Sequence, residues 1–306
     1  MKRNIFLLVL SVCIGLLVVF FACRSQKPVP ESGQKKSEKS GLTHVEKTEN
    51  VNKSVNLLRI ATFNIQNLGK SKLSKPLIMD TLVAIVRNFD IVAIQEISDI
   101  SNQTAGRFLE MINKKGATQY EMVCSNRSGC QANDKTSAEQ YAFYYNPALV
   151  QLVDNALYND SEADYFQREP YIAQFKYKKN GQMLTICTIH TAPEQAVEEI
   201  GALSKVVNWM PSRFKNTENI IICGDFNASC SYASTTELDD LAIRKSPFYW
   251  VIPDDEKTNL SKNTCAYDRF VTTTKLKDKI KKWEVYRYFK SKAVSDHWPG
   301  YIELAM

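Results

Sequence analysis

The chain has 306 residues, of which 44% are hydrophobic and 24% charged, and this mixture excludes a disordered or fibrous protein. Its formal net charge is +6, but residues 1–56 contain nine Lys or Arg and four Glu, so this segment alone carries +5. The remaining 250 residues carry only +1, so the overall charge is no argument for binding to nucleic acid. The length suffices for one large α/β domain with its own core.

The first 23 residues have the pattern of an export signal. Lys2 and Arg3 precede an apolar run from Ile5 to Ala22. The run is followed by Cys23, an ending that resembles the bacterial lipoprotein processing site, where the cysteine is lipidated. An uncleaved membrane anchor is the alternative, because about 18 apolar residues are near the minimum for a span. We therefore expect an exported protein, held in a bacterial cell envelope as a lipoprotein or by its signal anchor, or otherwise secreted.

Residues 24–56 contain almost no large apolar side chain, so little in them could offset the entropy lost on ordering. We expect a flexible tether here. No second stretch of this kind follows, and we interpret residues 57–306 as one domain.

Within this domain, short apolar runs alternate with helical patterns. Six runs are predicted strands: Leu57–Phe63, Ile91–Gln95, Tyr141–Tyr145, Ile172–Tyr177, Met183–Ile189 and Ile220–Cys223. Apolar residues at helical spacing predict a helix between Leu77 and Phe89, and a capping box at Thr191–Glu194 predicts another that runs to about Trp209. The alternation indicates parallel α/β units mixed with hairpins.

Polar side chains follow four of the predicted strands, and in α/β sheets chemistry gathers at such strand ends. They are Asn64, Glu96, His190, Asp225 and Asn227. The oxygens of Asn64, Glu96 and Asp296 suit a hard cation such as Mg²⁺. Imidazoles oriented by carboxylates, such as His190 and His297, can bind phosphate oxygens and move protons. Each residue alone is more often a turn former or a helix cap, but together they indicate a hydrolase of phosphate esters.

Seven strings, spread in order along the domain, carry a resemblance to a known family. They are Ile60-Ala-Thr-Phe-Asn-Ile, Asp90-Ile-Val-Ala-Ile-Gln-Glu96, Arg168-Glu-Pro, His190-Thr-Ala-Pro, Gly224-Asp-Phe-Asn-Ala-Ser-Cys-Ser-Tyr232, Asn263-Thr-Cys-Ala-Tyr-Asp-Arg269 and Ser295-Asp-His297. In these strings the domain resembles the endonuclease/exonuclease/phosphatase superfamily, and within it the pancreatic-type deoxyribonuclease I family. The resemblance implies an α/β fold, a four-layer sandwich of two packed mixed β-sheets flanked by helices. It also implies an exported, divalent-metal-dependent endonuclease that hydrolyses double-stranded DNA with little sequence specificity.

The same resemblance implies roles for individual residues. Asn64, Glu96 and Asp296 would hold Mg²⁺ or Mn²⁺. The catalytic group would be two carboxylate–imidazole couples, with Asp225 and Asn227 positioning the attacking water and the phosphate. The couples are Glu139 with His190 and Asp268 with His297. Arg168, Tyr232 and Tyr267 would contact the substrate.

The cysteines and acidic loops add structural expectations. The resemblance implies a disulfide between Cys230 and Cys265, and Cys124 and Cys130 could form a second one. Cys187 and Cys223 lie in apolar strands and are expected as buried thiols. One structural Ca²⁺ site of the family could be retained at Asp160, Asp164, the Phe166 carbonyl and Glu169. The other is expected to be lost, because Lys257 replaces its acidic ligand.

The sequence departs from the family at the residues that contact the DNA groove. Gln66, Ser98 and Ser137 stand where the family has two arginines and a tyrosine. The stretch from Lys275 to Lys292 contains eight basic and two acidic residues beside four aromatic ones, and we expect it to supply phosphate contacts instead. A solvated strand and loop is the alternative interpretation.

Two other functions are compatible with the sequence. A related phosphodiesterase acting on RNA or lipid head groups is conceivable because the groove arginines are missing, and a catalytically inactive surface-binding domain is the third hypothesis. The deoxyribonuclease strings and the presence of every expected catalytic residue favour the nuclease. We expect a monomer that does not bind actin, because Met122-Val-Cys124 does not reproduce the contact strand of the family's vertebrate enzyme.

Overall fold

The computed structural model describes residues 57–129, 138–161 and 163–306. The predicted export signal, Cys23 and the tether lie outside these ranges, as do Cys130 and Ser137. Within the described ranges, no helix combines the length and the apolar character that a membrane span requires. All six predicted strands and both predicted helices fall inside them.

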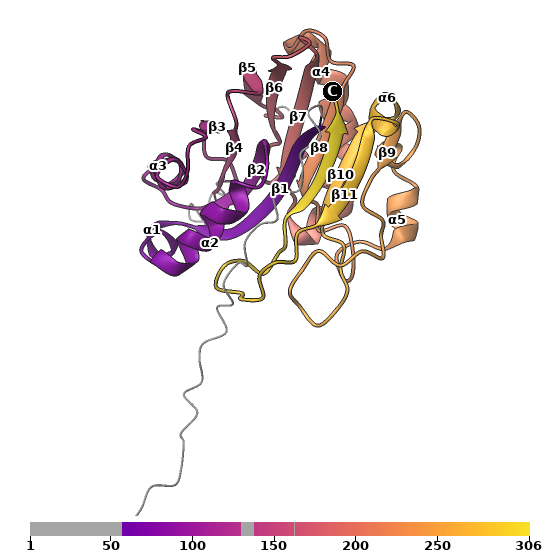
Figure 1. Cartoon of the computed structure of the whole chain (residues 1–306). Coiled ribbons are helices and arrows are strands. Elements are labelled where there is room, and N and C mark those ends of the chain that lie inside the picture. Colours follow the sequence, from indigo (N-terminus) through magenta and orange to yellow (C-terminus); the bar gives the residue numbers. More distant parts are fainter. Residues whose placement is uncertain (1–56, 130–137, 162) are drawn as a thin grey trace, which may run out of the picture. The chain divides into compact units, whose positions relative to one another are not determined.

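Two six-stranded sheets form the centre of the fold (Figure 1). The first sheet has, in spatial order, β11 (Ile280–Val285), β12 (Gly300–Ala305), β1 (Leu57–Leu68), β2 (Ile91–Ile97), β4 (Gln140–Tyr145) and β3 (Glu121–Cys124). The second has β5 (Val150–Leu157), β6 (Tyr171–Tyr177), β7 (Met183–His190), β8 (Ile220–Asp225), β10 (Asp268–Thr273) and β9 (Phe248–Trp250). The pairs β1–β2 and β7–β8 are parallel and the other pairs are antiparallel, so both sheets are mixed.

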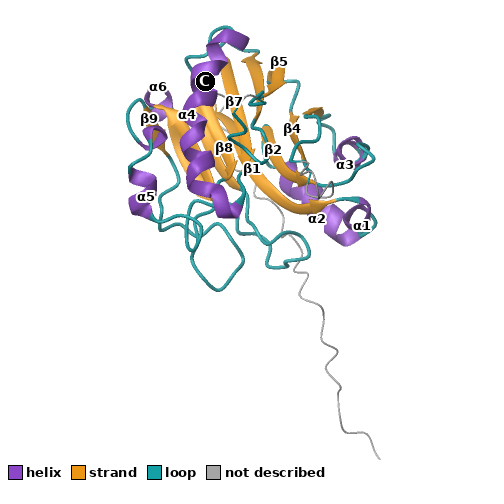
Figure 2. Cartoon of the chain, turned by 180° about the vertical axis from the view of Figure 1, so that it is seen from behind, coloured by secondary structure: helices purple, strands orange, loops and turns teal. Residues whose placement is uncertain are grey.

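Helices cover the outer faces of the two sheets (Figure 2). The helices are α1 (Lys70–Leu73), α2 (Pro76–Val86), α3 (Thr104–Asn113), α4 (Ala196–Arg213), α5 (Thr235–Asp239) and α6 (Thr274–Lys277), with 3₁₀ turns at Pro193–Gln195 and Ala242–Arg244. Buried residues of α2 and α3 pack on the first sheet, and those of α4 pack on the second. The layer order is therefore helix, sheet, sheet, helix, which confirms the predicted four-layer sandwich.

The continuous apolar runs in the sequence result from burial on both faces of each sheet. In β2, Ile91 and Ala93 lie in the core between the two sheets, whereas Val92 and Ile94 face the outer core under α2 and α3. Because successive side chains of a strand point to opposite faces, a strand in a middle layer is apolar at most positions, and the polar residues inside it are hydrogen-bonded to each other, as Gln95 is to Thr62 and Thr188. Most of the charged residues of the candidate site accordingly lie at strand ends.

The predicted capping box at Thr191 is wrong. Backbone N–H of Thr191 still donates to the carbonyl of Asp225, which extends the pairing of β7 with β8 by one residue. This keeps the hydroxyl of Thr191 buried, without a hydrogen-bond partner among the described residues. The chain then forms the 3₁₀ turn, and α4 begins only at Ala196. A capping box does occur at α5, between Ser234 and Glu237.

The proposed phosphate-binding stretch from Lys275 to Lys292 is divided between opposite ends of the sheets. Strand β10 begins at Asp268, opposite Asp225, and runs away from it towards α6. Strand β11 returns, pairing Ile280 with Leu304 and Val285 with Gly300. The four lysines from Lys275 to Lys281 therefore lie at the end remote from Asp225, and the expectation that they contact the substrate phosphate there is wrong. Only the part after Val285 returns to that end.

Candidate active site

The predicted site residues meet at one end of the two sheets. Asn64 lies in β1 and Glu96 in β2 of the first sheet, whereas His190 and Asp225 end β7 and β8 of the second. Nδ2 of Asn64 donates to Oε1 of Glu96 at 2.8 Å and to Oδ2 of Asp225 at 2.9 Å. Asn64 thus joins the two sheets at the centre of the cluster.

Backbone bulges change the direction of the chain at the ends of β1 and β2. The β1–β2 register shifts between Asn64 and Leu68, and the β2–β4 register shifts between Ile94 and Ile97. Glu96 has a φ of 62°, and Gln66 has a φ of 52°, so both residues adopt a left-handed backbone that non-glycine residues rarely take. Such bulges redirect side chains at the edges of active sites, and here Oε2 of Glu96 turns to the backbone N–H of Asn67 at 2.8 Å.

Two carboxylate–imidazole couples flank Asp225. Nδ1 of His190 lies 2.9 Å from Oε2 of Glu139, and Nδ1 of His297 lies 2.8 Å from Oδ2 of Asp268. The opposite nitrogens, Nε2 of His190 and Nε2 of His297, lie 3.7 and 3.5 Å from the same oxygen, Oδ2 of Asp225. The structure therefore brings both expected couples together around one carboxylate.

Burial and charge act against each other on these groups. Burial disfavours the charged imidazole of His297, but Asp268 and Asp225 outweigh it and raise the pKa of His297 to about 10. The pKa of His190 is also raised, because Glu139 outweighs the effect of burial. In turn, burial raises the pKa of Asp225 but the two imidazoles outweigh it, so that the pKa of Asp225 is lowered. Burial raises the pKa of Asp268 although His297 opposes this shift. The shifts of the other three groups favour charged imidazoles that face a charged Asp225.

Arg168 and Asn227 support the loop after β7. Nε of Arg168 donates to the carbonyl of His190 and Nη2 to that of Thr191, both at 3.0 Å, while Nη1 lies 3.6 Å from Oε1 of Glu139. All three guanidinium nitrogens thus face protein oxygens, an arrangement that fits a positioning role better than the predicted contact with a phosphate. Nδ2 of Asn227 donates to the same Thr191 carbonyl at 3.1 Å, and its backbone N–H donates to Oδ1 of Asp225 at 3.0 Å.

Two tyrosines extend from His297 towards solvent. The ring of Tyr267 lies 5.9 Å from the ring of His297, and Tyr232 lies 5.7 Å beyond it, centroid to centroid. Tyr232 is 38% exposed. The two rings therefore form an accessible wall beside the imidazole, as expected of residues that contact a substrate.

Three oxygen-bearing residues remain as candidate metal ligands. Glu96 and Asn64 are in direct contact, and Asp296 is half-buried beside His297. Among the described residues, no group of three or more His, Cys, Asp and Glu has the geometry of a metal site. The donors present are carboxylate and amide oxygens, which fit Mg²⁺ or Mn²⁺.

Two buried charged residues near the site were missed by sequence reasoning. Nζ of Lys72 donates to the carbonyls of Ile65, Gln66 and Val294. Burial lowers the pKa of Lys72 to about 8, although Glu96 and Asp296 oppose this shift. Glu199 in α4 accepts from the N–H groups of Gln167 and Ala192, and its pKa is raised to about 7 by burial. Neither residue is set apart in sequence from ordinary surface Lys and Glu.

The disulfide expected between Cys230 and Cys265 is present. It connects the loop after Asn227 to the segment that leads into Tyr267 and Asp268. Cys187 and Cys223 are buried thiols, as predicted. Cys124 is an unbridged thiol that accepts from Nε2 of Gln140, and its predicted partner Cys130 lies outside the described residues.

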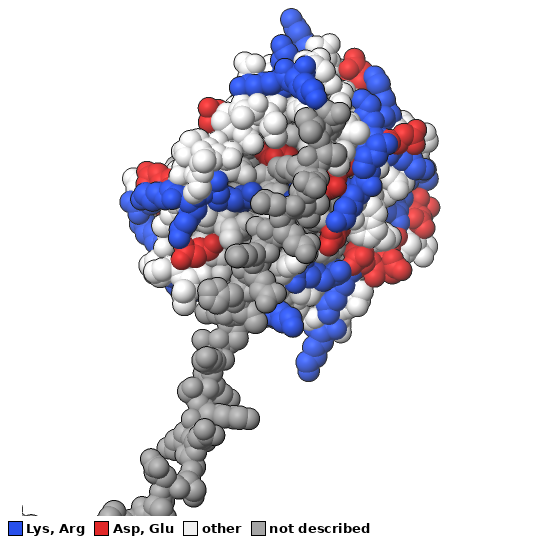
Figure 3. Space-filling model, viewed as in Figure 1, with Lys and Arg blue, Asp and Glu red and all other residues white. Residues whose placement is uncertain are grey.

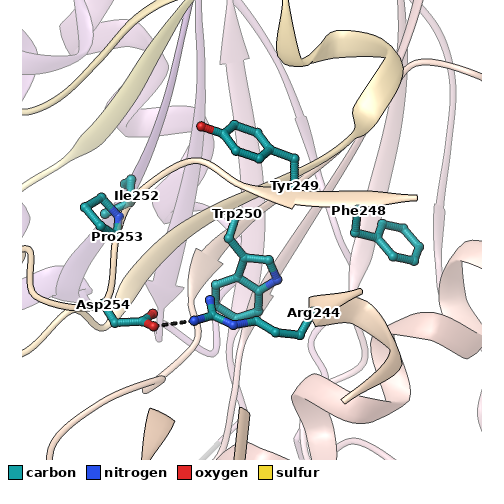
Figure 4. Close-up of a pocket in the computed structure, with 7 residues that line it drawn as sticks. All are labelled: Arg244, Phe248, Tyr249, Trp250, Ile252, Pro253 and Asp254. Carbon is teal, nitrogen blue, oxygen red and sulfur yellow. Dashed lines mark hydrogen bonds and ion pairs between the residues drawn. The ribbon is translucent and has the colours of Figure 1, made fainter. Parts of the chain in front are cut away.

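A separate hollow of about 350 Å³ lies beside β9 (Figure 4). The charged groups that line it neutralise one another: Asp254 binds the guanidinium groups of both Arg244 and the buried Arg269, and Arg244 lies 4.5 Å from the ring centre of Trp250. Arg269 follows Asp268 directly in β10. The residues that line the hollow thus help to hold β10 in place.

The four-layer sandwich, with two carboxylate–imidazole couples at one end of both sheets, places the chain among the α/β sandwich hydrolases. It belongs to the endonuclease/exonuclease/phosphatase family, whose sequence model matches residues 61–297. Deoxyribonuclease-1 of Oryctolagus cuniculus is 32% identical over 81% of this chain and 92% of that protein. Deoxyribonuclease gamma of Homo sapiens is 37% identical over 70% of this chain and 71% of that protein.

Solved structures show the same fold at lower identity. A humanized D. rerio TDP2 matches with a TM-score of 0.58 at 16% identity, over 82% of this chain and 99% of that one. An endonuclease/exonuclease/phosphatase from Bacteroides vulgatus matches with a TM-score of 0.58 at 15% identity, also over 82% of this chain and 99% of that one. These likenesses confirm the sandwich fold, and the homology to the deoxyribonucleases supports a DNA-hydrolysing member of the family.

Proposed function

We propose that the protein is an exported, divalent-metal-dependent endonuclease that hydrolyses double-stranded DNA with little sequence specificity. The observation that carries this proposal is the pair of carboxylate–imidazole couples whose Nε2 atoms both face Oδ2 of Asp225. The deoxyribonucleases named above support DNA as the substrate, since they are 32% and 37% identical to this chain.

The proposed metal ligands are Asn64, Glu96 and Asp296. When bound there, Mg²⁺ or Mn²⁺ supplies positive charge that offsets the charge of the phosphate and the charge that develops on it during attack. Asn64 fixes one carboxylate oxygen of Glu96 through its amide and leaves its own Oδ1 to accept from the N–H of Gln66 at 3.0 Å. These contacts hold the oxygen donors in place before any ligand binds.

The imidazoles and Asp225 would carry out the proton transfers. Because Glu139 and Asp268 hold Nδ1 of the two imidazoles, each Nε2 faces the substrate side. We assign Asp225 to take a proton from the attacking water as the water oxygen forms a bond to phosphorus in line with the P–O bond that breaks. An imidazole then protonates the leaving oxygen, while the other donates to a phosphate oxygen. Asn227 positions the phosphate, and Tyr232 and Tyr267 contact the adjoining nucleotides.

The location of the protein is part of the same proposal. The signal-like N-terminus and Cys23 support a lipoprotein of a bacterial cell envelope, and we propose that the enzyme is a monomer that does not bind actin. Mass measurement of the mature N-terminus tests the lipoprotein assignment. A diacylated Cys23 supports it, and a chain that begins at Met1 contradicts it.

Three substrates distinguish the proposed function from its alternatives: supercoiled plasmid, RNA and sphingomyelin. We expect plasmid nicking in Mg²⁺ plus Ca²⁺ that chelator abolishes and that His190→Ala and His297→Ala each remove. The matched control is Lys114→Ala, at an exposed position at the end of α3, and it should cut like the wild type. If the intact protein leaves plasmid uncut but hydrolyses RNA or sphingomyelin, the substrate proposed here is wrong. If it hydrolyses none of them, the enzyme proposal is wrong.

A further inference from the structure

Two loops beside His297 carry a concentration of positive charge. One loop, residues 256–262, contains Lys257 and Lys262, and the other, residues 286–292, contains Arg287, Lys290 and Lys292. The only acidic residue in these two segments is Glu256, which forms an ion pair with Arg287. We call these five basic residues the cationic rim. In Figure 3, Lys and Arg side chains protrude at the lower end of the molecule, where these orange and yellow loops lie in Figure 1, and others lie at the top, left and right of the same face.

The two loops are fixed to each other and to the site. Backbone N–H of Leu260 donates to the carbonyl of Asp296 at 2.7 Å, and that of Trp298 donates to the carbonyl of Thr258 at 2.8 Å. An isolated β-bridge pairs Asn259 with His297 between these contacts. The first loop therefore pairs with the backbone of His297 itself, and the ion pair of Arg287 with Glu256 joins the second loop to it.

The second loop, residues 286–292, is held in place by buried side chains and hydrogen bonds. Tyr286, Phe289 and Val294 are buried, Nε1 of Trp298 donates to the carbonyl of Phe289, and Nζ of Lys72 donates to that of Val294. Lys290 and Lys292 are exposed between these anchors. A backbone held at both sides presents its charges without a large entropic cost on binding.

Among the described residues, lysines without a hydrogen-bond or ion-pair partner occur at both ends of the molecule, but those of the rim lie at the end of the sheets that holds the site. At the end remote from the site, Lys281 donates to the carbonyl of Asp278 and Lys282 forms an ion pair with Glu284. In the rim, the side chains of Lys262, Lys290 and Lys292 have no hydrogen-bond or ion-pair partner within the described part of the chain. Their charges are thus available to an anionic ligand, and the ligand adjacent to the catalytic imidazoles is the substrate.

We propose that the cationic rim binds the DNA backbone phosphates on the His297 side of the scissile bond. The proposal rests on the proposed function and extends it, because binding to the backbone would take the place of the groove arginines that Gln66 and Ser98 replace. Interactions with phosphates carry no sequence information, and each one adds to the salt dependence of binding. The affinity of the rim for DNA would therefore depend on the salt concentration but not on the base sequence.

The test compares two triple variants with the same change in charge. The rim variant is Lys262→Gln with Lys290→Gln and Lys292→Gln, and the control is Lys275→Gln with Lys277→Gln and Lys281→Gln. Binding to a 20-base-pair duplex is measured from 50 to 300 mM NaCl, with His190→Ala added to every protein to prevent cutting. We expect the slope of log Kd against log salt to decrease by about 2–3 in the rim variant, at roughly 0.9 for each phosphate that is no longer neutralised, and to stay unchanged in the control.

Three outcomes overturn the proposal in different ways. If the wild type nicks plasmid but both triple variants keep its salt slope, the rim does not bind DNA and the proposed function stands. If the wild type neither binds nor cuts DNA, both proposals are wrong. Flotation with phosphatidylglycerol vesicles separates a third outcome: vesicle binding that the rim variant alone loses, with an unchanged DNA slope, would assign the rim to a membrane surface and overturn the proposal.

Discussion

Nδ2 of Asn64 donates a hydrogen bond of 2.9 Å to Oδ2 of Asp225, although 161 residues separate them in sequence and they belong to different sheets. The same amide binds Glu96, so one side chain connects the proposed metal ligands of the first sheet to the carboxylate between the two imidazoles. The site therefore exists only when the two sheets are packed. Its geometry depends on the apolar core between them, to which Ile60, Ile91 and Cys223 contribute.

The two imidazoles are expected to act on one substrate rather than independently. We predict that His190→Ala and His297→Ala each reduce kcat for plasmid nicking by about 10²–10⁴-fold, the usual contribution of a positioned acid or base. The double variant should lose much less than the product of the two losses, because residues that act as a unit are not additive. Measured kcat values at saturating DNA check this, and a fully multiplicative double variant would contradict it.

Lys72 is expected to connect the strand end after Asn64 to the loop before Asp296. Lys72→Met leaves the carbonyls of Ile65, Gln66 and Val294 without their donor, and we expect a loss of about 3 kcal/mol in the free energy of unfolding. The strand end after Asn64 and the loop before Asp296 would then be joined less firmly, so the Mg²⁺ concentration for half-maximal activity should rise. Denaturant titration and a Mg²⁺ series measure the two effects. Lys75→Met, at an exposed position three residues away, should show neither.

The fold and the catalytic couples could be predicted from the sequence because their signals are local. Apolar runs marked six strands, and the short strings around His190 and His297 carried a family resemblance. The roles of Lys72 and Glu199 could not be predicted, because their partners are backbone carbonyls and N–H groups that carry no sequence signal. The basic stretch shows the same limit: its composition is continuous, but β11 places its first lysines at one end of the sheet and Lys290 at the other.

Glu199 should make stability depend on pH near neutrality. Its pKa is raised by burial to about 7, above the usual value for Glu, so the folded state binds a proton more tightly than the unfolded state. Stability associated with this group is therefore greatest at low pH and falls between about pH 4.5 and 7. The Glu199→Gln variant lacks the titrating carboxyl group and so lacks this decrease of stability with pH. We predict that the stability of the wild type relative to the variant decreases from pH 5 to pH 8, measured by urea unfolding, and a constant difference would refute this.

The Ca²⁺ site expected at Asp160, Asp164, Phe166 and Glu169 gives a further prediction. Asp160 is buried and accepts from the N–H of Phe166 at 2.9 Å, and Oε2 of Glu169 is buried without a hydrogen-bond partner among the described residues. These oxygens suit Ca²⁺, which would stabilise the folded state by mass action. We expect millimolar Ca²⁺ to raise the thermal midpoint of the wild type but not of Glu169→Gln. Equal shifts in the two proteins would place the ion elsewhere.

The disulfide between Cys230 and Cys265 is expected to stabilise the site as well as the fold. It closes a loop between residues 35 apart, for which chain entropy in the unfolded state corresponds to about 4 kcal/mol. The variant with both cysteines replaced by serine should therefore melt roughly 8–16 °C lower. The bond ties the loop after Asn227 to the segment leading into Asp268. The variant should therefore also nick plasmid more slowly than the wild type at temperatures where both proteins are folded. Reductant should reproduce both effects in the wild type and change neither in the variant; a reductant-sensitive variant would show that another thiol is responsible.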